Sequence, residues 1–272
     1  MIGPLLLALV VTAPPSLAPV AERLRTIDQE QLETVLADAG LALPALVRVT
    51  LIDEDDTRAR QTPRWIVGFA VGTEDVAIFP ARVGSYPYAS LESVLRHEVV
   101  HLALSSRAGG HGLPRWFQEG VAVSVEEGWT WGSDLRLLLG AAGAPGIADL
   151  GRLFQSETHL GSAEAYRLAA ALVADVRERH GAAVPGAIAG RVARGVPFPH
   201  AFRIETGETP DEAAARAWAG YRRWTAWLPV VTGGSAVWTL ILALAFVAFV
   251  ARSRKRARRR KQWADEEELP LE

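Results

Sequence analysis

The chain has β-type segments in its first third and segments of helical periodicity after them. Residues 46–52 alternate apolar and polar side chains and are rich in β-branched residues, which is typical of a half-buried strand. Residues 65–71 and 76–79 have the same character, and the turn sequence Gly72-Thr73-Glu74-Asp75 separates them. From Ser90 onward the apolar positions recur at helical spacing. We therefore expect an α+β fold with a small, mainly antiparallel sheet followed by helices.

Capping residues and glycines indicate where the helices begin and end. Ser90 is a suitable N-cap, and Pro114 is suited to the first turn of a helix. Gly40 and Gly181 each follow an apolar periodic segment, as a C-terminal glycine does. Helices are therefore expected over residues 21–39, 90–104, 114–127, 134–139, 163–180 and 209–227.

The N-terminal apolar segment is short. Residues 5–11 are continuously apolar, which is too few to span a bilayer core of about 30 Å. Ser16 and Ala18 are small residues at the two positions that a signal peptidase reads. These features predict a secretory signal peptide over residues 1–18. The alternative is a buried N-terminal helix.

A second apolar segment lies near the C-terminus. Residues 228–250 contain no charged side chain, and as a helix they would extend about 34 Å, enough to cross a bilayer. Trp224 and Trp227 precede this segment, and eight cationic residues follow it within residues 252–261. The cationic side is expected in the cytoplasm. The sequence thus predicts a transmembrane helix over residues 228–251, a basic and then acidic cytoplasmic tail over 252–272, and an extracytoplasmic domain over 19–227.

The amino-acid composition limits which catalytic groups, metal ligands and partners are possible. The chain has no cysteine, so a metal ion must be held by His, Asp or Glu, and a cysteine nucleophile is excluded. Residues 19–227 carry 21 arginines and no lysine against 26 acidic residues, a formal charge of −5. We therefore expect no nucleic-acid partner for this domain. The basic tail adjoins the apolar segment, so membrane lipid is its expected neighbour.

The sequence His97-Glu98-Val99-Val100-His101 carries the candidate chemistry. On a helix, residues i and i+4 lie on one face, so the two imidazoles can hold one Zn²⁺ ion. Glu98 lies at the edge of that face and can accept a proton from a water that the ion activates. The alternative is a surface helix that carries two histidines and no metal. The apolar residues around the motif favour a buried helix, in which polar side chains need a partner.

A third ligand is expected on the following helix. A catalytic zinc site uses three protein ligands and leaves one position open. Glu119 follows His101 by 18 residues, which allows a helix end, a glycine-containing loop and an antiparallel return. Gly120 and Ala122 are small, so the two helices can approach closely around an ion.

The motif His-Glu-x-x-His, followed by Pro-x-Trp-x-x-Glu-Gly-x-Ala, resembles the gluzincin metallopeptidases, thermolysin-like zincins whose third ligand is a glutamate. The chain most resembles the small peptidase-MA-like group, over about residues 46–218. The resemblance implies His97, His101 and Glu119 as zinc ligands and Glu98 as general base and acid. It also implies Tyr166 as the donor that stabilises the oxyanion. The alternative for Tyr166 is a half-buried core tyrosine.

Two further residues have open assignments. His111, in the glycine-rich loop before Pro114, can lie near the site or simply be solvated. Glu126 can orient a ligand histidine or be a surface carboxylate.

These features together predict a membrane-anchored, zinc-dependent peptidase with a peptide or protein substrate. The rival hypothesis is a catalytically inactive gluzincin-fold module that serves binding or assembly at the membrane. An intramembrane protease is excluded, because Glu92 and Arg96 flank the motif and no apolar span contains it.

Overall fold

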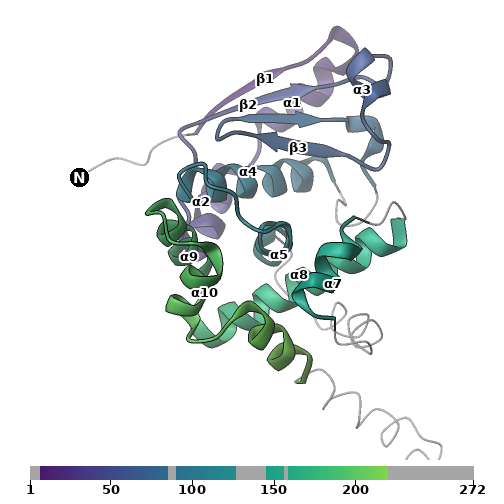
Figure 1. Cartoon of the computed structure of the whole chain (residues 1–272). Helices are drawn as coiled ribbons and strands as arrows, with labels where there is room; N and C mark the ends of the chain where they lie inside the picture. The colour runs from purple at the N-terminus through teal and green to yellow at the C-terminus, as the bar shows by residue number, and fades with distance from the viewer. Residues whose placement is uncertain (1–6, 85–89, 127–144, 156–158, 220–272) are drawn as a thin grey trace, which may run out of the picture. The chain divides into compact units, whose positions relative to one another are not determined.

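The chain divides into one unit over residues 1–220 and a second over residues 221–272. The computed structural model describes residues 7–84, 90–126, 145–155 and 159–219, so the second unit lies outside the described residues. The described part is α+β, with a four-stranded sheet and a larger set of helices (Figure 1). None of its helices is long and apolar enough to cross a membrane. The transmembrane helix and tail predicted over residues 228–272 are outside this part of the chain.

The sheet consists of β1 (Ala8–Thr12), β2 (Leu46–Leu51), β3 (Gly68–Val71) and β4 (Asp75–Ile78) in the order β1-β2-β4-β3. β1 and β4 both pair in parallel with β2, and only β3 and β4 pair antiparallel. The expectation of a mainly antiparallel sheet was therefore wrong. The connection through α3 (Thr57–Gln61) carries the chain past β2, so the β3–β4 hairpin returns with β4 beside β2.

The two faces of the sheet differ in polarity. Val47, Val49 and Leu51 on β2 are buried together with Val76 and Ile78 on β4. The helix α4 packs against β3 and β4, so these strands contribute one wall of the core. On the opposite face Arg48 is exposed and pairs with Glu74 and Asp75.

The N-terminal segment contributes a strand. β1 lies within the stretch predicted as a signal peptide, and its Val11 is buried while Leu7 just before it is also buried. The sequence predicted a cleaved leader or, as the alternative, a buried helix, and neither prediction includes this pairing with β2. Cleavage after residue 18 stays a prediction, and it would remove this edge strand.

The first predicted helix is split into two. α1 covers Ala18–Arg25 and α2 covers Gln29–Asp38, so one helix over residues 21–39 was wrong. Asp28 caps α2, because its side chain accepts a hydrogen bond from the backbone N–H of Gln31 at 2.9 Å. A capping aspartate favours a helix start over a helix interior.

Two consecutive helices carry the motif residues. α4 (Leu91–Arg107) begins at a capping box in which Ser90 and Ser93 each accept from the other's backbone N–H at 3.1 Å. It ends before Gly109 and Gly110, which both have positive φ. α5 (Arg115–Glu126) follows Pro114 and packs against α4. Both predicted helices are thus confirmed.

The remaining helices complete the core below α4, as Figure 1 shows. α8 packs along α5, while α9 contacts α4 and α10. These remaining helices are α7 (Ile147–Leu153), α8 (His159–His180), α9 (Val184–Ala193), α10 (Phe198–Thr206) and a helix over 210–219.

Candidate metal centre

The helix α4 presents both motif histidines on one side. His97 and His101 are one turn apart, and their ring centroids lie 4.8 Å from each other. His97 is fully buried, and the side chain of His101 is 15% exposed. Val99 and Val100, between them in sequence, are buried in the core and hold the helix in place. The two imidazoles therefore occupy a fixed position at the edge of the interior.

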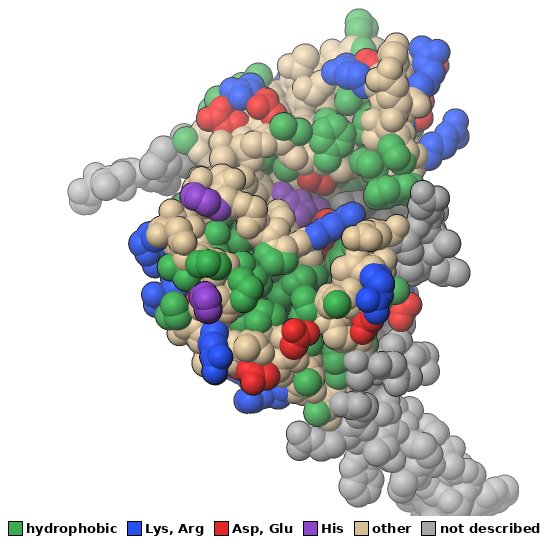
Figure 2. Space-filling model, viewed as in Figure 1, with side chains coloured by type: hydrophobic (Ala, Val, Ile, Leu, Met, Phe, Trp, Pro, Cys, Tyr) green, Lys and Arg blue, Asp and Glu red, His purple; other side chains and the backbone are tan. Residues whose placement is uncertain are grey.

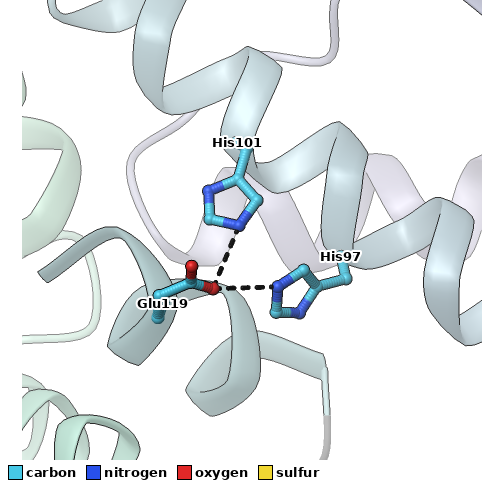
Figure 3. Close-up of side chains that lie close together, drawn as sticks. All are labelled: His97, His101 and Glu119. Carbon is cyan, nitrogen blue, oxygen red and sulfur yellow. Dashed lines mark hydrogen bonds and ion pairs between the residues drawn. The ribbon is translucent and has the colours of Figure 1, made fainter. Parts of the chain in front are cut away.

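The helix α5 brings a carboxylate to the same point. Glu119 Oε2 lies 3.2 Å from His97 Nε2 and 3.3 Å from His101 Nε2. Figure 3 shows both contacts ending at the same oxygen, while the second Glu119 oxygen takes part in neither. A close crossing of α5 and α8 sets this position, because Gly120 faces the backbone of Ala169 without an intervening Cβ.

These three side chains could together hold one metal ion. Two atoms that each lie about 2.1 Å from an ion, at a tetrahedral angle, are separated by about 3.4 Å. The two carboxylate–imidazole distances of 3.2 and 3.3 Å match this separation. All three ligand atoms lie within 4.8 Å of one another. Two imidazoles and one carboxylate are also a ligand set that catalytic zinc sites use.

The electrostatics of the cluster favour a cation. Burial alone raises the pKa of Glu119, but the neighbouring His101 and His97 outweigh burial and hold that pKa well below its usual range. The Glu119 carboxyl group therefore stays ionised in the interior. A buried anion of this kind needs a compensating positive charge.

Glu98 lies between this cluster and the sheet. Its side chain is buried, and burial raises its pKa above the usual range, against the opposing effect of His101 and His97. The backbone of Ala70 on β3 also opposes this rise in pKa. Gly68 permits the close approach of this strand, because a Cβ there would lie 2.9 Å from Val94 Cγ1 and 3.3 Å from Glu98 Oε1. The edge strand β3 thus positions the candidate base.

Tyr166 comes to the site from α8. Its ring centroid lies 6.3 Å from that of His97 and 5.4 Å from that of Phe154. Burial raises the pKa of its phenol, and the Glu119 carboxylate adds to this effect. Tyr166 therefore keeps its proton and can donate a hydrogen bond. Its placement beside His97 agrees with the predicted position, and its role stays a prediction.

The structure adds a residue that the sequence argument omitted. Arg115 Nε lies 3.4 Å from Glu119 Oε1, and Arg115 Nη1 donates to the backbone carbonyl of Phe154 at 3.2 Å. The spacing i to i+4 between Arg115 and Glu119 could have indicated this pair.

The structure places His111 outside the ligand cluster and does not describe the side chain of Glu126. His111 Nδ1 lies 3.0 Å from the carbonyl oxygen of Ala108, and His111 is not a member of the ligand cluster. The side chain of Glu126 lies outside the described residues.

The candidate centre is not sealed from solvent, because the side chain of His101 is 15% exposed and that of Glu119 is 11% exposed. Figure 2 shows a hollow between the sheet-containing part and the helical part of the described unit. Histidine, acidic and basic side chains gather in this hollow, while apolar side chains line much of the helical part next to it. A bound ion could therefore be reached by a substrate.

Comparison of the chain with protein-family models and with curated proteins finds no match.

Proposed function

We propose that this chain is a membrane-anchored, zinc-dependent peptidase. The observation that carries the proposal is the convergence of His97, His101 and Glu119 within bonding reach of a single ion. A buried carboxylate, Glu98, stands beside them at the edge of the sheet. The sequence resemblance to the gluzincin metallopeptidases supports the same assignment.

The chain's own residues have separate roles in the proposed hydrolysis. A zinc ion bound by His97, His101 and Glu119 would lower the pKa of a water molecule and polarise the scissile carbonyl. Glu98 takes the proton from the attacking water and returns it to the leaving amine. Its raised pKa suits both directions of transfer, because a base and acid works best near the working pH. Tyr166 donates its phenolic hydrogen to the developing oxyanion.

The free edge of the sheet supports a peptide as the substrate. Among the described strands β3 pairs only with β4. The N–H of Phe79 donates to the carbonyl of Val67, so the next groups along the free edge belong to Gly68 and Ala70. An extended peptide that adds to this edge would bring its backbone to Glu98.

The location is part of the proposal. The apolar residues 228–250 and the cationic residues that follow them support one C-terminal span, with the peptidase domain outside the cytoplasm. Peptide or protein substrates would then be extracytoplasmic, and membrane lipid would surround the span.

The test compares the purified full-length chain with two single variants, using elemental analysis and cleavage of a denatured protein mixture. We expect one zinc per wild-type chain and measurable cleavage. Glu98→Gln should keep the zinc and lose about 10²- to 10⁴-fold in turnover. Glu119→Ala should lose the zinc.

Two outcomes would contradict parts of the proposal. An active Glu98→Gln variant would show that Glu98 is not the base. A zinc-containing wild-type chain that cleaves nothing would favour the inactive binding or assembly module instead.

A further inference from the structure

Arg115 lies on the first turn of α5, one turn before Glu119, at the border of the candidate metal centre. Its side chain is 47% exposed, so part of the guanidinium faces solvent. Its Nε lies 3.4 Å from Glu119 Oε1. A cation this close to a ligand carboxylate influences how that carboxylate binds, in addition to contributing positive charge to the surface.

The contacts of Arg115 hold its guanidinium in one place. Nη1 donates to the backbone carbonyl of Phe154 at 3.2 Å, and the guanidinium carbon lies 5.1 Å from the centre of the Phe154 ring. The positive charge of Arg115 also lowers the pKa of the Tyr166 phenol, against the larger effect of burial. One side chain thus links α5 and the C-terminal end of α7.

The two oxygens of Glu119 have different partners. Oε2 faces both histidines, at 3.2 and 3.3 Å, whereas Oε1 faces Arg115. A carboxylate whose second oxygen is bound to a guanidinium can offer only its first oxygen to an ion. That arrangement leaves more of the coordination sphere open for water and substrate.

We propose that Arg115 is a positioning residue. It holds Glu119 so that a single oxygen faces the metal. The inference rests on the proposed zinc-dependent hydrolysis. It goes beyond the ligand set, because it assigns a residue that controls how the ligand binds.

Arginine is suited to this task. Its planar guanidinium has five donor hydrogens in a fixed geometry, so it can bind Glu119 and a carbonyl oxygen at once. The ammonium group of lysine is a single point of charge on a flexible stem. Arg115→Lys should therefore recover only part of the function.

The experiment uses full-length Arg115→Met and Arg115→Lys chains loaded with cobalt or zinc. The visible absorption of the cobalt protein reports the coordination number, since four-coordinate cobalt absorbs more strongly than five-coordinate cobalt. We expect weaker absorption in Arg115→Met, because the freed Glu119 oxygen also binds the ion. The zinc dissociation constant should rise about 10- to 100-fold. The kcat should fall more than the KM changes, and Arg115→Lys should be intermediate.

Arg48→Met is the matched control. Arg48 is also 47% exposed and pairs with carboxylates, but these are Glu74 and Asp75 on the far face of the sheet. Its cobalt absorption, zinc affinity and kcat should equal those of the wild type. The control distinguishes the general effect of removing a paired surface arginine from the specific effect of removing Arg115.

The outcomes are distinguishable from failure of the proposed function. An Arg115→Met chain with wild-type absorption, zinc affinity and kcat overturns this role of Arg115 while leaving the wild-type enzyme intact. If Arg115→Met does not fold, Arg115→Lys decides, and wild-type values in that variant also overturn the inference. A wild-type chain that binds neither metal overturns the proposed function and this role with it.

Discussion

At the scale of single residues, the buried acids of the described part have basic or imidazole side chains beside them. Glu208 is buried and accepts from Arg179 at 2.6 Å, with Arg216 at 3.2 Å. Glu98 and Glu119 are buried close together beside two imidazoles. Since isolated buried carboxylates cost several kcal/mol, a divalent cation at this centre would supply the compensation that arginines supply at Glu208.

The pair formed by Glu54 and Arg82 should make stability depend on pH. Arg82 is 6% exposed, and its guanidinium donates to Glu54, to the backbone carbonyl of Ala59 in α3 and to that of Ile66 in the loop before β3. The hydrogen bond from Arg82 lowers the pKa of Glu54, against the opposing effect of burial. A lowered folded-state pKa means that the contribution is present above the unfolded-state pKa of about 4.3 and is lost as pH falls through the folded value.

Glu54→Gln should therefore lower stability by about 1 kcal/mol at pH 7, because Glu54 is partly exposed and solvent screens the pair. The difference in Tm from the wild type should shrink below pH 4, as measured by thermal unfolding between pH 3 and pH 7. Glu33→Gln, on the exposed side of α2, controls for the loss of one negative charge. A difference in Tm that is the same at both ends of the pH range would contradict the prediction.

At the scale of elements, the position of Glu119 depends on how closely α5 approaches α8. A Cβ at Gly120 would lie 2.5 Å from the backbone oxygen of Ala169 and 2.6 Å from Val173 Cγ2. Because backbone atoms cannot rotate away, any side chain at this position must push the two helices apart. The proposed metal ligand Glu119 is the adjacent residue, so we expect helix packing and metal binding to be coupled.

Gly120→Ala should destabilise the fold by roughly 1–3 kcal/mol, because overpacking outweighs the better helix propensity of alanine. Zinc affinity, measured by competition with a chelator, should fall as well. Gly151→Ala is the control, because it is also a helical glycine but its Cβ would meet nothing within 4 Å. That variant should gain up to about 1 kcal/mol with unchanged zinc affinity. Equal effects of the two substitutions would rule out the proposed close crossing.

At the scale of the whole molecule, the two ends of the chain carry the predicted leader and the predicted membrane anchor. The N-terminal segment has the apolar character of a leader, yet residues 8–12 pair with β2 and bury Val11. A leader that is cleaved would leave β2 as the sheet edge. The C-terminal apolar residues are the expected anchor for the domain.

A chain that begins at residue 19 should be less stable than one that begins at residue 7. Losing the β1–β2 ladder and the buried side chains of Leu7 and Val11 should cost roughly 3–6 kcal/mol, from about 1.5–3 kcal/mol for each side chain. Thermal unfolding of the two chains measures this difference, and N-terminal sequencing of the exported protein shows which form exists. Equal Tm values would mean that β1 is dispensable.

Ending the chain at residue 227 should release the protein from the membrane fraction. The full-length chain should stay in that fraction after a high-salt wash, because its apolar segment is long enough to span the hydrocarbon core. Replacing the eight cations of residues 252–261 by glutamine tests the tail separately, and that variant should remain membrane-bound. A full-length chain that is found in the soluble fraction would contradict the anchor.

Local sequence determined the parts of this protein that depend on short-range periodicity and capping. The spacing of His97 and His101 places both on one face, and Ser90 and Gly109 bound the helix that carries them, because helix geometry relates residues within a few positions. The alternation of apolar and polar side chains predicted the strands over residues 46–52 and 76–79 in the same way. The motif also supplied Glu119 as a candidate ligand, through its resemblance to gluzincins.

Only the tertiary structure decided how distant segments meet. The parallel pairing of β1 and β4 with β2, the oxygen of Glu119 that faces the histidines, and the contact of Arg115 with Phe154 all join residues far apart in the chain or depend on side-chain packing. Periodicity reports which side of an element is apolar, but it does not report which partner covers that side. Those choices arise from close packing, in which one missing Cβ at Gly120 allows two helices to meet.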